Sequence, residues 1–270
     1  MPCVCAALLC ALAGSAPAWA GPWAAEVMSY NLGVGGETSY TDPSAVLGAP
    51  ARYTGEGIWP GAVTPFNPAF STDQVLSLGS GGQLTVRFDQ AITDDAAHPF
   101  GVDLLIFGNG SFIDGDWPNG VAAGLFEEGP FTVSVSGDGA TFVPLTGTYY
   151  DGMYPTLGYT DLTGAYDVNA GVLPTDFTRS VDPNLGASAF IGKTFAEIVA
   201  MYDGSGGGIP IDVHEAGLSE IHYVRIDVPS GGASPEIDGF AVVPEPTTAM
   251  FLGLGGVLLC GLRRARHVSR

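Results

Sequence analysis

The middle of this sequence lacks cysteine and is poor in basic residues. All four cysteines lie at positions 3, 5, 10 and 260, so the long stretch between them carries no thiol. This excludes disulfides and thiolate metal sites there. A stretch of about 225 residues can bury a core large enough to fold without disulfides.

Five basic residues and all 28 acidic residues lie between positions 21 and 246, which gives that stretch a formal charge of −23. A charge of this sign argues against a nucleic-acid partner, whose phosphates it would repel. It suits solubility and divalent cations, and its simplest interpretation is an acidic surface in water.

Helical periodicity is also scarce. Phe195, Ile198 and Met201 recur at the spacing of one helix face, which predicts a single short helix over about residues 194–201. The 40 glycines and 20 prolines are typical of a chain with many turns.

Alternating apolar and polar residues predict β-strands instead. Leu84, Val86 and Phe88 share one face of a predicted strand, and Phe131, Val133 and Val135 share one face of another. Asp138-Gly139 follows the second run and predicts a hairpin turn before the next strand at 141–143. Three further runs complete the pattern: "GVDLLIFGNG" as a buried central strand, "IHYVRIDV" and "EIDGFAVV".

We therefore expect an all-β fold, an antiparallel β-sandwich or jelly roll. Residues 146–192 are aromatic, polar and rich in turns, and we expect them to form long loops packed on the sandwich. The strings "LSLGSGGQLTVRFDQ", "SGDGATF" and "SPEIDGF" resemble bacterial cell-surface modules, with a hairpin similar to that of galactose-binding-like (discoidin-type) jelly rolls. The resemblance covers about residues 28–243 and implies a fold and a surface location, but no activity.

The two ends differ in kind from the middle. Residues 1–20 carry no charge and end in Ala18-Trp19-Ala20, which predicts a signal peptide cut by signal peptidase after Ala20. The alternative is a buried N-terminal helix. Residues 247–262 are also uncharged, and at about 1.5 Å per residue this helix would be short for a bilayer but able to span it.

The C-terminal segment resembles a known sorting signal. Pro244-Glu245-Pro246, the apolar segment and then Arg263, Arg264 and Arg266 follow one another in the order of the PEP-CTERM tail of Gram-negative bacteria. That tail is also called an ice-binding protein C-terminal domain, but this chain has no threonine ladder of the kind ice binding needs. The resemblance implies recognition by an exosortase-type processing enzyme in the inner membrane and an association with exopolysaccharide.

Three parts are expected on this basis. They are a signal peptide (1–20), an exported β-sandwich domain (21–242) and a sorting tail (243–270) with a transmembrane segment (247–262) and an Arg-rich cytoplasmic end (263–270). The mature protein would pass through the inner membrane to the cell surface or extracellular matrix. A permanent single-span anchor is the alternative to cleavage.

Candidate metal ligands occur in "SFIDGDWPNG". Asp114, Asp116 and Asn119 lie close together in a Gly/Pro-containing loop, and their oxygens suit Ca²⁺. The loop is not an EF-hand, and an acidic turn in water is the alternative interpretation. Asp94, Asp95 and Asp103 are candidates to complete such a site.

Catalytic motifs are weak. Asp212, His214 and Glu215 place a histidine beside carboxylates, but no second histidine or nucleophile motif accompanies them. We expect no enzyme, and we interpret His222 as a core or edge residue of a strand.

Aromatic residues in loops suggest a sugar-binding platform, because an aromatic ring stacks on the apolar face of a sugar. The candidates are Trp117, Tyr149, Tyr150 and Tyr154, with Tyr159 and Tyr166 nearby. Packing over the ends of the sandwich is the alternative. Together these patterns predict a non-enzymatic surface or matrix protein; the alternatives are a calcium-stabilised carbohydrate-binding module and a secreted hydrolase.

Overall fold

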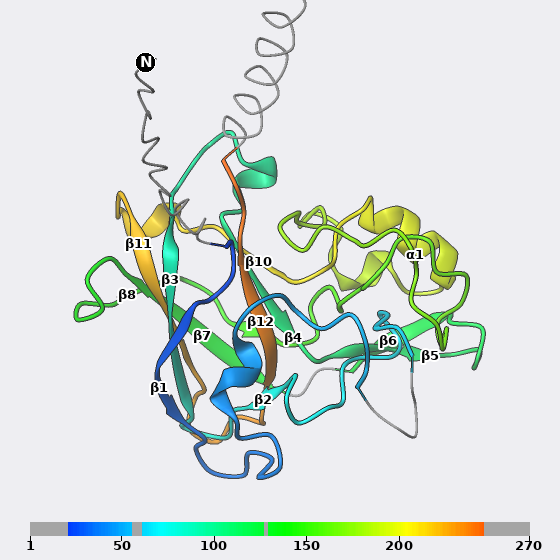
Figure 1. Cartoon of the computed structure of the whole chain (residues 1–270), viewed down its shortest axis with the longest axis horizontal. Coiled ribbons are helices and arrows are strands. Elements are labelled where there is room, and N and C mark those ends of the chain that lie inside the picture. Colours follow the sequence, from blue (N-terminus) through cyan, green and yellow to red (C-terminus); the bar gives the residue numbers. More distant parts are fainter. Residues whose placement is uncertain (1–20, 56–60, 127–128, 246–270) are drawn as a thin grey trace, which may run out of the picture.

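The computed structural model describes residues 21–55, 61–126 and 129–245. Two antiparallel sheets pack face to face in this part of the chain (Figure 1). The fold is therefore an all-β sandwich with long loops, as the alternating runs predicted. The expected signal peptide, the apolar segment 247–262 and the arginines that follow lie outside the described residues.

The larger sheet has the strand order β1-β3-β11-β7-β8, with β9 also paired to β7. Its strands are β1 (Glu26–Asn31), β3 (Gln83–Ile92), β11 (Ile221–Asp227), β7 (Pro130–Ser136), β8 (Val143–Pro144) and β9 (Tyr149–Tyr150). The predicted hairpin at Asp138-Gly139 is confirmed, although its second strand begins at Val143 and not at 141.

The smaller sheet has the order β10-β4-β12-β2. Its strands are β10 (Ile209–Ile211), β4 (Leu104–Gly108), β12 (Glu236–Val242) and β2 (Leu76–Ser77). Every residue of β4 is buried, which confirms the prediction of a central strand for its continuous apolar run.

The sandwich core lies between the two sheets. Leu84, Val86 and Phe88 of β3 meet Phe240 of β12 there, and all four side chains are fully buried. At about 25 cal/mol per Å² of apolar surface, burial of such large side chains contributes roughly 2–3 kcal/mol each. The two-residue period of β3 therefore places one apolar row in the core, while Asp89 of the opposite row is exposed.

A second apolar cluster lies beside the sandwich, on the right of Figure 1. It is built from the hairpin of β5 (Ser111–Asp114) and β6 (Ala122–Phe126), the helix α1 (Phe195–Tyr202) and the loops between residues 146 and 192. Four short 3-10 helices complete the elements: η1 (Pro43–Val46), η2 (Pro99–Gly101), η3 (Ala187–Ala189) and η4 (His214–Ala216).

The helix α1 confirms the predicted short helix within one residue at each end. Thr194 caps it, because its side chain accepts from the backbone N–H of Glu197 while the Glu197 carboxylate accepts from the N–H of Thr194. Phe195 and Ile198 are buried as the spacing predicted, but Tyr202 takes the third buried position and Met201 is half-buried. No helix within the described residues is long and apolar enough to cross a membrane.

Candidate functional site

An open cleft of about 400 Å³ lies between the β5–β6 hairpin and the end of the smaller sheet. We call it the aromatic cleft, because six aromatic rings line it. Its residues come from segments far apart in the chain: Tyr40, Phe66, Asn67, Pro68, Phe70, Asn109, Ser111, Trp117, Phe126, Tyr166 and Glu236. Its volume is within the range of about 300–1,000 Å³ that is usual for small-molecule sites.

Trp117 is the most exposed aromatic ring of the cleft, with 65% of its surface accessible. It lies in the turn between β5 and β6, and Asp114 holds that turn in shape. One carboxylate oxygen of Asp114 accepts from the N–H groups of Asp116 (2.9 Å) and Val121 (3.0 Å), and the other accepts from Gly120 (3.1 Å). The loop thus presents a large indole ring to water on a backbone fixed by hydrogen bonds.

Tyr166 faces Trp117 across the cleft. Their ring centroids lie 6.4 Å apart, with the planes tilted by 58°. Burial raises the pKa of the Tyr166 phenol to about 12, and the charge of the hydrogen-bonded Asp114 carboxylate contributes to the shift. The phenol is therefore neutral at any physiological pH and donates a hydrogen bond to the Asp114 carboxylate. This hydrogen bond fixes the ring beside the indole.

Polar groups lie next to the rings. Asn109 donates from Nδ2 to Oε2 of Glu236 at 3.0 Å, and both side chains are half-buried. Phe70 and Phe126 are exposed over 39% and 52% of their surfaces. Exposed rings flanked by amide and carboxylate groups can stack on the C–H face of a sugar and bond its hydroxyls.

The four aromatic residues predicted as a glycan platform do not come together. Trp117 lies in the aromatic cleft, whereas Tyr149 packs on Phe131 of the core and Tyr150 pairs with β7 at an outer edge. Tyr154 is only 6% exposed and donates its hydroxyl to the Pro183 carbonyl at 3.2 Å. The structure therefore does not bring the four together as one platform, because Tyr149 and Tyr154 pack against the two apolar clusters.

The predicted calcium ligands Asp114, Asp116 and Asn119 do lie in one loop. However, both carboxylate oxygens of Asp114 accept hydrogen bonds from backbone N–H groups of that loop. Asp116 accepts a hydrogen bond from Asn119 Nδ2 at 3.2 Å. Through these hydrogen bonds the three residues stabilise the turn itself. Calcium binding by them stays a prediction.

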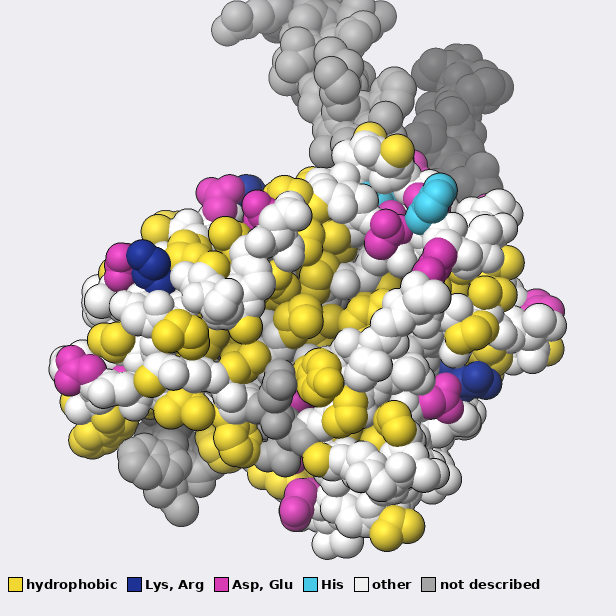
Figure 2. Space-filling model, turned by 180° about the vertical axis from the view of Figure 1, so that it is seen from behind, with side chains coloured by type: hydrophobic (Ala, Val, Ile, Leu, Met, Phe, Trp, Pro, Cys, Tyr) yellow, Lys and Arg dark blue, Asp and Glu magenta, His cyan; other side chains and the backbone are white. Residues whose placement is uncertain are grey.

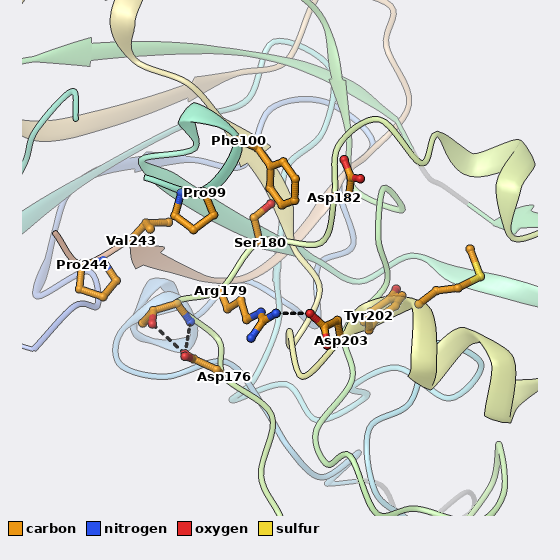
Figure 3. A pocket seen from close by; sticks show the side chains of 12 residues that line it. Pro99, Phe100, Asp176, Arg179, Ser180, Asp182, Tyr202, Asp203, Val243 and Pro244 are labelled. Carbon is orange, nitrogen blue, oxygen red and sulfur yellow. Dashed lines mark hydrogen bonds and ion pairs between the residues drawn. The ribbon is translucent and has the colours of Figure 1, made fainter. Parts of the chain in front are cut away.

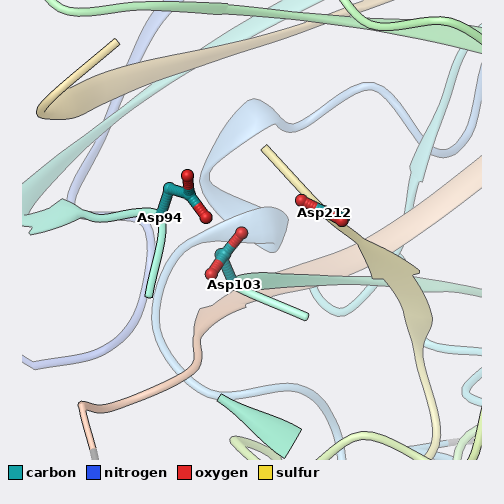
Figure 4. Close-up of side chains that lie close together, drawn as sticks. All are labelled: Asp94, Asp103 and Asp212. Carbon is teal, nitrogen blue, oxygen red and sulfur yellow. The ribbon is translucent and has the colours of Figure 1, made fainter. Parts of the chain in front are cut away.

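Asp94 and Asp103 do not approach that loop but converge with Asp212 instead (Figure 4). Their carboxylate oxygens lie within 4.8 Å of one another. Asp103 is fully buried and accepts from the N–H of Val213 at 3.0 Å, with His98 Nδ1 at 2.7 Å. Burial raises the pKa of Asp103, and its hydrogen bonds oppose the rise. Asp103 therefore serves to join β4 to the loop after β10.

Each residue of the suggested catalytic group around His214 also makes a structural hydrogen bond of its own. His214 is exposed, its Nδ1 lies 2.7 Å from Asp94 Oδ2, and this partner raises its pKa. Asp212 accepts from the backbone N–H of His214, and Glu215 accepts from both the N–H and the hydroxyl of Thr146. Among the described residues no serine, threonine or cysteine nucleophile is hydrogen-bonded to this histidine.

A larger hollow of about 510 Å³ lies at the opposite end of the smaller sheet (Figure 3). Phe100 and the ion pair of Arg179 with Asp203 face it from different loops, and Val243 and Pro244 close one side. Phe100 is its one exposed ring, since Tyr202 is 1% exposed and donates its hydroxyl to the Pro155 carbonyl. This hollow has no pair of exposed rings, and the aromatic cleft is the better candidate for a ligand with flat apolar faces.

The reverse face of the molecule is hollowed between the sandwich and the helix-bearing loops (Figure 2). Hydrophobic side chains gather across the middle of this face, and a histidine surrounded by acidic side chains lies near its upper rim. An apolar hollow of about 200 Å³ at the junction of the two parts is lined by residues such as Met153, Tyr154 and Pro210. It offers few polar groups to orient a ligand.

No protein-family model and no curated protein matches this chain. Among solved structures, a pectin binding carbohydrate binding module in a monoclinic crystal form matches with a TM-score of 0.26 and 10% sequence identity, over 63% of this chain and 71% of that one. A likeness this slight shows neither a shared family nor a shared ligand. The assignment of the candidate site therefore rests on its geometry alone.

Proposed function

We propose that this protein binds glycans at the cell surface or in the extracellular matrix, and that the aromatic cleft is its binding site. The observation that carries the proposal is the pair formed by Trp117 and Tyr166, an indole exposed over 65% of its surface and held beside a phenol in a cleft of about 400 Å³.

Exposing such rings to water lowers the stability of the folded protein, and a binding function would explain why they are exposed. An indole left in water forgoes the stabilisation that burial of its apolar surface would provide, at about 25 cal/mol per Å². Contiguous exposed apolar surface on a soluble domain is typical of binding sites. Phe70 and Phe126 extend this surface on the walls of the cleft, and Asn109 and Glu236 supply hydrogen-bonding groups at its edge.

The surface location is proposed from the sequence. An apolar N-terminal segment ending in Ala18-Trp19-Ala20 and the tail from Pro244 to the arginines support export, sorting by an exosortase-type enzyme and transit through the inner membrane. Exopolysaccharide is then the glycan class that the protein would meet. Within this proposal the protein has a non-enzymatic role in adhesion or matrix structure.

A glycan array with the purified full chain tests this proposal. We expect binding to a defined set of oligosaccharides, and a loss of at least about tenfold in affinity in Trp117→Ala, equivalent to about 1.4 kcal/mol. Phe100→Ala is the matched control, since it removes an exposed ring from the other hollow. Equal loss in both variants, or no glycan bound by the wild type, contradicts the proposal.

A further inference from the structure

A second hollow continues from the aromatic cleft. We call it the acidic extension; its volume is about 400 Å³ and it is lined by Val34, Gly35, Glu37, Gly232, Ala233, Ser234 and Glu236. Glu236 lines both hollows, so the two adjoin at this residue. A ligand that stacks on the rings can therefore also contact Glu236.

The two glutamates of this region flank one residue of β2. Glu236 is the register partner of Ser77 in the β12–β2 ladder, and Glu37 donates its backbone N–H to Ser77 Oγ at 3.0 Å. Ser77 also donates its backbone N–H to the carbonyl of Tyr40, a residue of the aromatic cleft, at 2.9 Å. Backbone contacts around Ser77 thus place two carboxylates and one ring of the cleft at the same edge of the sheet.

The charge along both hollows has one sign. Of the described residues that line them, Glu37 and Glu236 are acidic, and none is lysine, arginine or histidine. The stretch from 21 to 246 adds a formal charge of −23 around the site. A uronic acid or a sulfated sugar would meet carboxylates of like charge here, which opposes binding.

We propose that the ligand is a glycan of amino sugars with free amino groups. The inference rests on the proposed function, and it names the chemical class that the same site selects. An ammonium group on the sugar ring donates charge-assisted hydrogen bonds to Glu236 and Glu37. The rings of Trp117 and Tyr166 can stack on the C–H faces of the sugar units. The length of the two hollows favours an oligomer over a single sugar.

Three hexasaccharide probes test the inference with the full chain: β-1,4-linked glucosamine, its N-acetylated counterpart and oligogalacturonate. We expect the glucosamine hexamer to bind at least about tenfold more tightly than the acetylated hexamer at mildly acidic pH. The preference should shrink between about 0.05 and 0.5 M salt, because the charges are partly exposed and are screened. Oligogalacturonate should bind weakest.

The double variant Glu37→Gln/Glu236→Gln separates charge from shape. We expect it to lose the preference for the free amine, so that the free and acetylated hexamers bind with similar affinity. Glu220→Gln, an exposed glutamate outside both hollows, should retain the preference. A thermal melt checks that the double variant is folded, and the salt dependence of the wild type tests the inference independently of it.

The outcomes distinguish the inference from the proposed function. Equal binding of the free and acetylated hexamers, abolished by Trp117→Ala, overturns the inference and leaves glycan binding in place. Tighter binding of oligogalacturonate, or of an oligolysine peptide, also overturns it. If no oligosaccharide binds, both proposals fail.

Discussion

Asp238 is a described carboxyl group whose ionisation the fold opposes. It lies on β12, is only 4% exposed, and both of its carboxylate oxygens accept from the N–H of Ala51 at 3.1 Å. Burial raises its pKa from 3.8 to about 7, and the hydrogen bond from Ala51 limits the rise. The folded protein therefore keeps a proton on Asp238 at pH values where the unfolded chain has lost it.

The direction of the pH effect follows from this difference. Since the folded pKa lies above the unfolded one, the stabilising contribution of Asp238 is complete below about pH 4 and is lost as the pH rises to about 7. Over this window the loss is roughly 4 kcal/mol. Asp238→Asn removes the ionisation and keeps an oxygen that accepts from Ala51.

We predict that the free energy of unfolding of Asp238→Asn falls less than that of the wild type between about pH 4 and pH 8. Urea denaturation at intervals of pH measures it, and the difference between the two proteins isolates Asp238 from the other carboxylates. Glu220→Gln serves as the exposed control. Parallel profiles for wild type and Asp238→Asn contradict the assignment.

At the scale of elements, β4 is held close to the chain that follows β9. A Cβ added at Gly108, the last residue of β4, would lie 2.1 Å from the carbonyl oxygen of Asp151 and 2.6 Å from its Cα. Both contacts are with backbone, which cannot move aside as a side chain can. Glycine at this position therefore lets the central strand lie against the loop before Met153.

Gly108→Ala should destabilise the protein by about 3 kcal/mol, the upper part of the usual cost of overpacking. Gly124→Ala is the matched control in β6, where the added Cβ would first meet Cδ1 of the exposed Ile113 at 3.2 Å. The midpoints of urea denaturation compare the two. Similar small effects in both variants would show that β4 and the Asp151 segment are not in tight contact.

The elements that could be predicted from the sequence are those with one fully buried face. The alternation of apolar and polar residues in β3, β7 and β11 indicates the buried face, and the continuous apolar run of β4 indicates burial of both faces. The strands β1 and β6 carry no such signal. Four of the six residues of β1 are exposed, and β6 contains two alanines and a glycine, which have low strand propensity.

The aromatic cleft could be predicted only in part. Trp117 stands out in a loop of turn residues, and Tyr166 lies among polar neighbours. Phe70, Phe126 and Glu236 were missed, because they join the cleft through the packing of the hairpin against the end of the smaller sheet. Tertiary packing brings these residues together, and no residue spacing in the sequence indicates that they meet.

At the scale of the whole molecule, the cleft and the two ends of the described stretch lie at opposite ends of β12. Val242 donates its N–H to the carbonyl of Pro22 at 2.7 Å, so the described chain begins and ends side by side, at the top of Figure 1. Glu236, at the start of β12, lines the cleft. Seven residues of strand separate the two ends by roughly 20 Å. A domain held by its C-terminus would thus present the cleft away from its attachment.

The proposed export predicts the size of the mature protein. Material isolated from the surface of the native host should lack residues 1–20 and the residues after about Pro246, because both segments are proposed to be removed in transit. Intact-mass measurement gives both ends at once. A mass that corresponds to the full 270 residues contradicts the processing.

The most direct test of the account is a fluorescence titration that follows Trp117 itself. The chain has four tryptophans, and the difference between wild type and Trp117→Phe isolates the emission of this one. With the tightest-binding oligosaccharide from the array, we expect a saturable blue shift of that emission, since a stacked sugar removes water from the indole. Saturable binding of the glycan with no change in the Trp117 emission would contradict it.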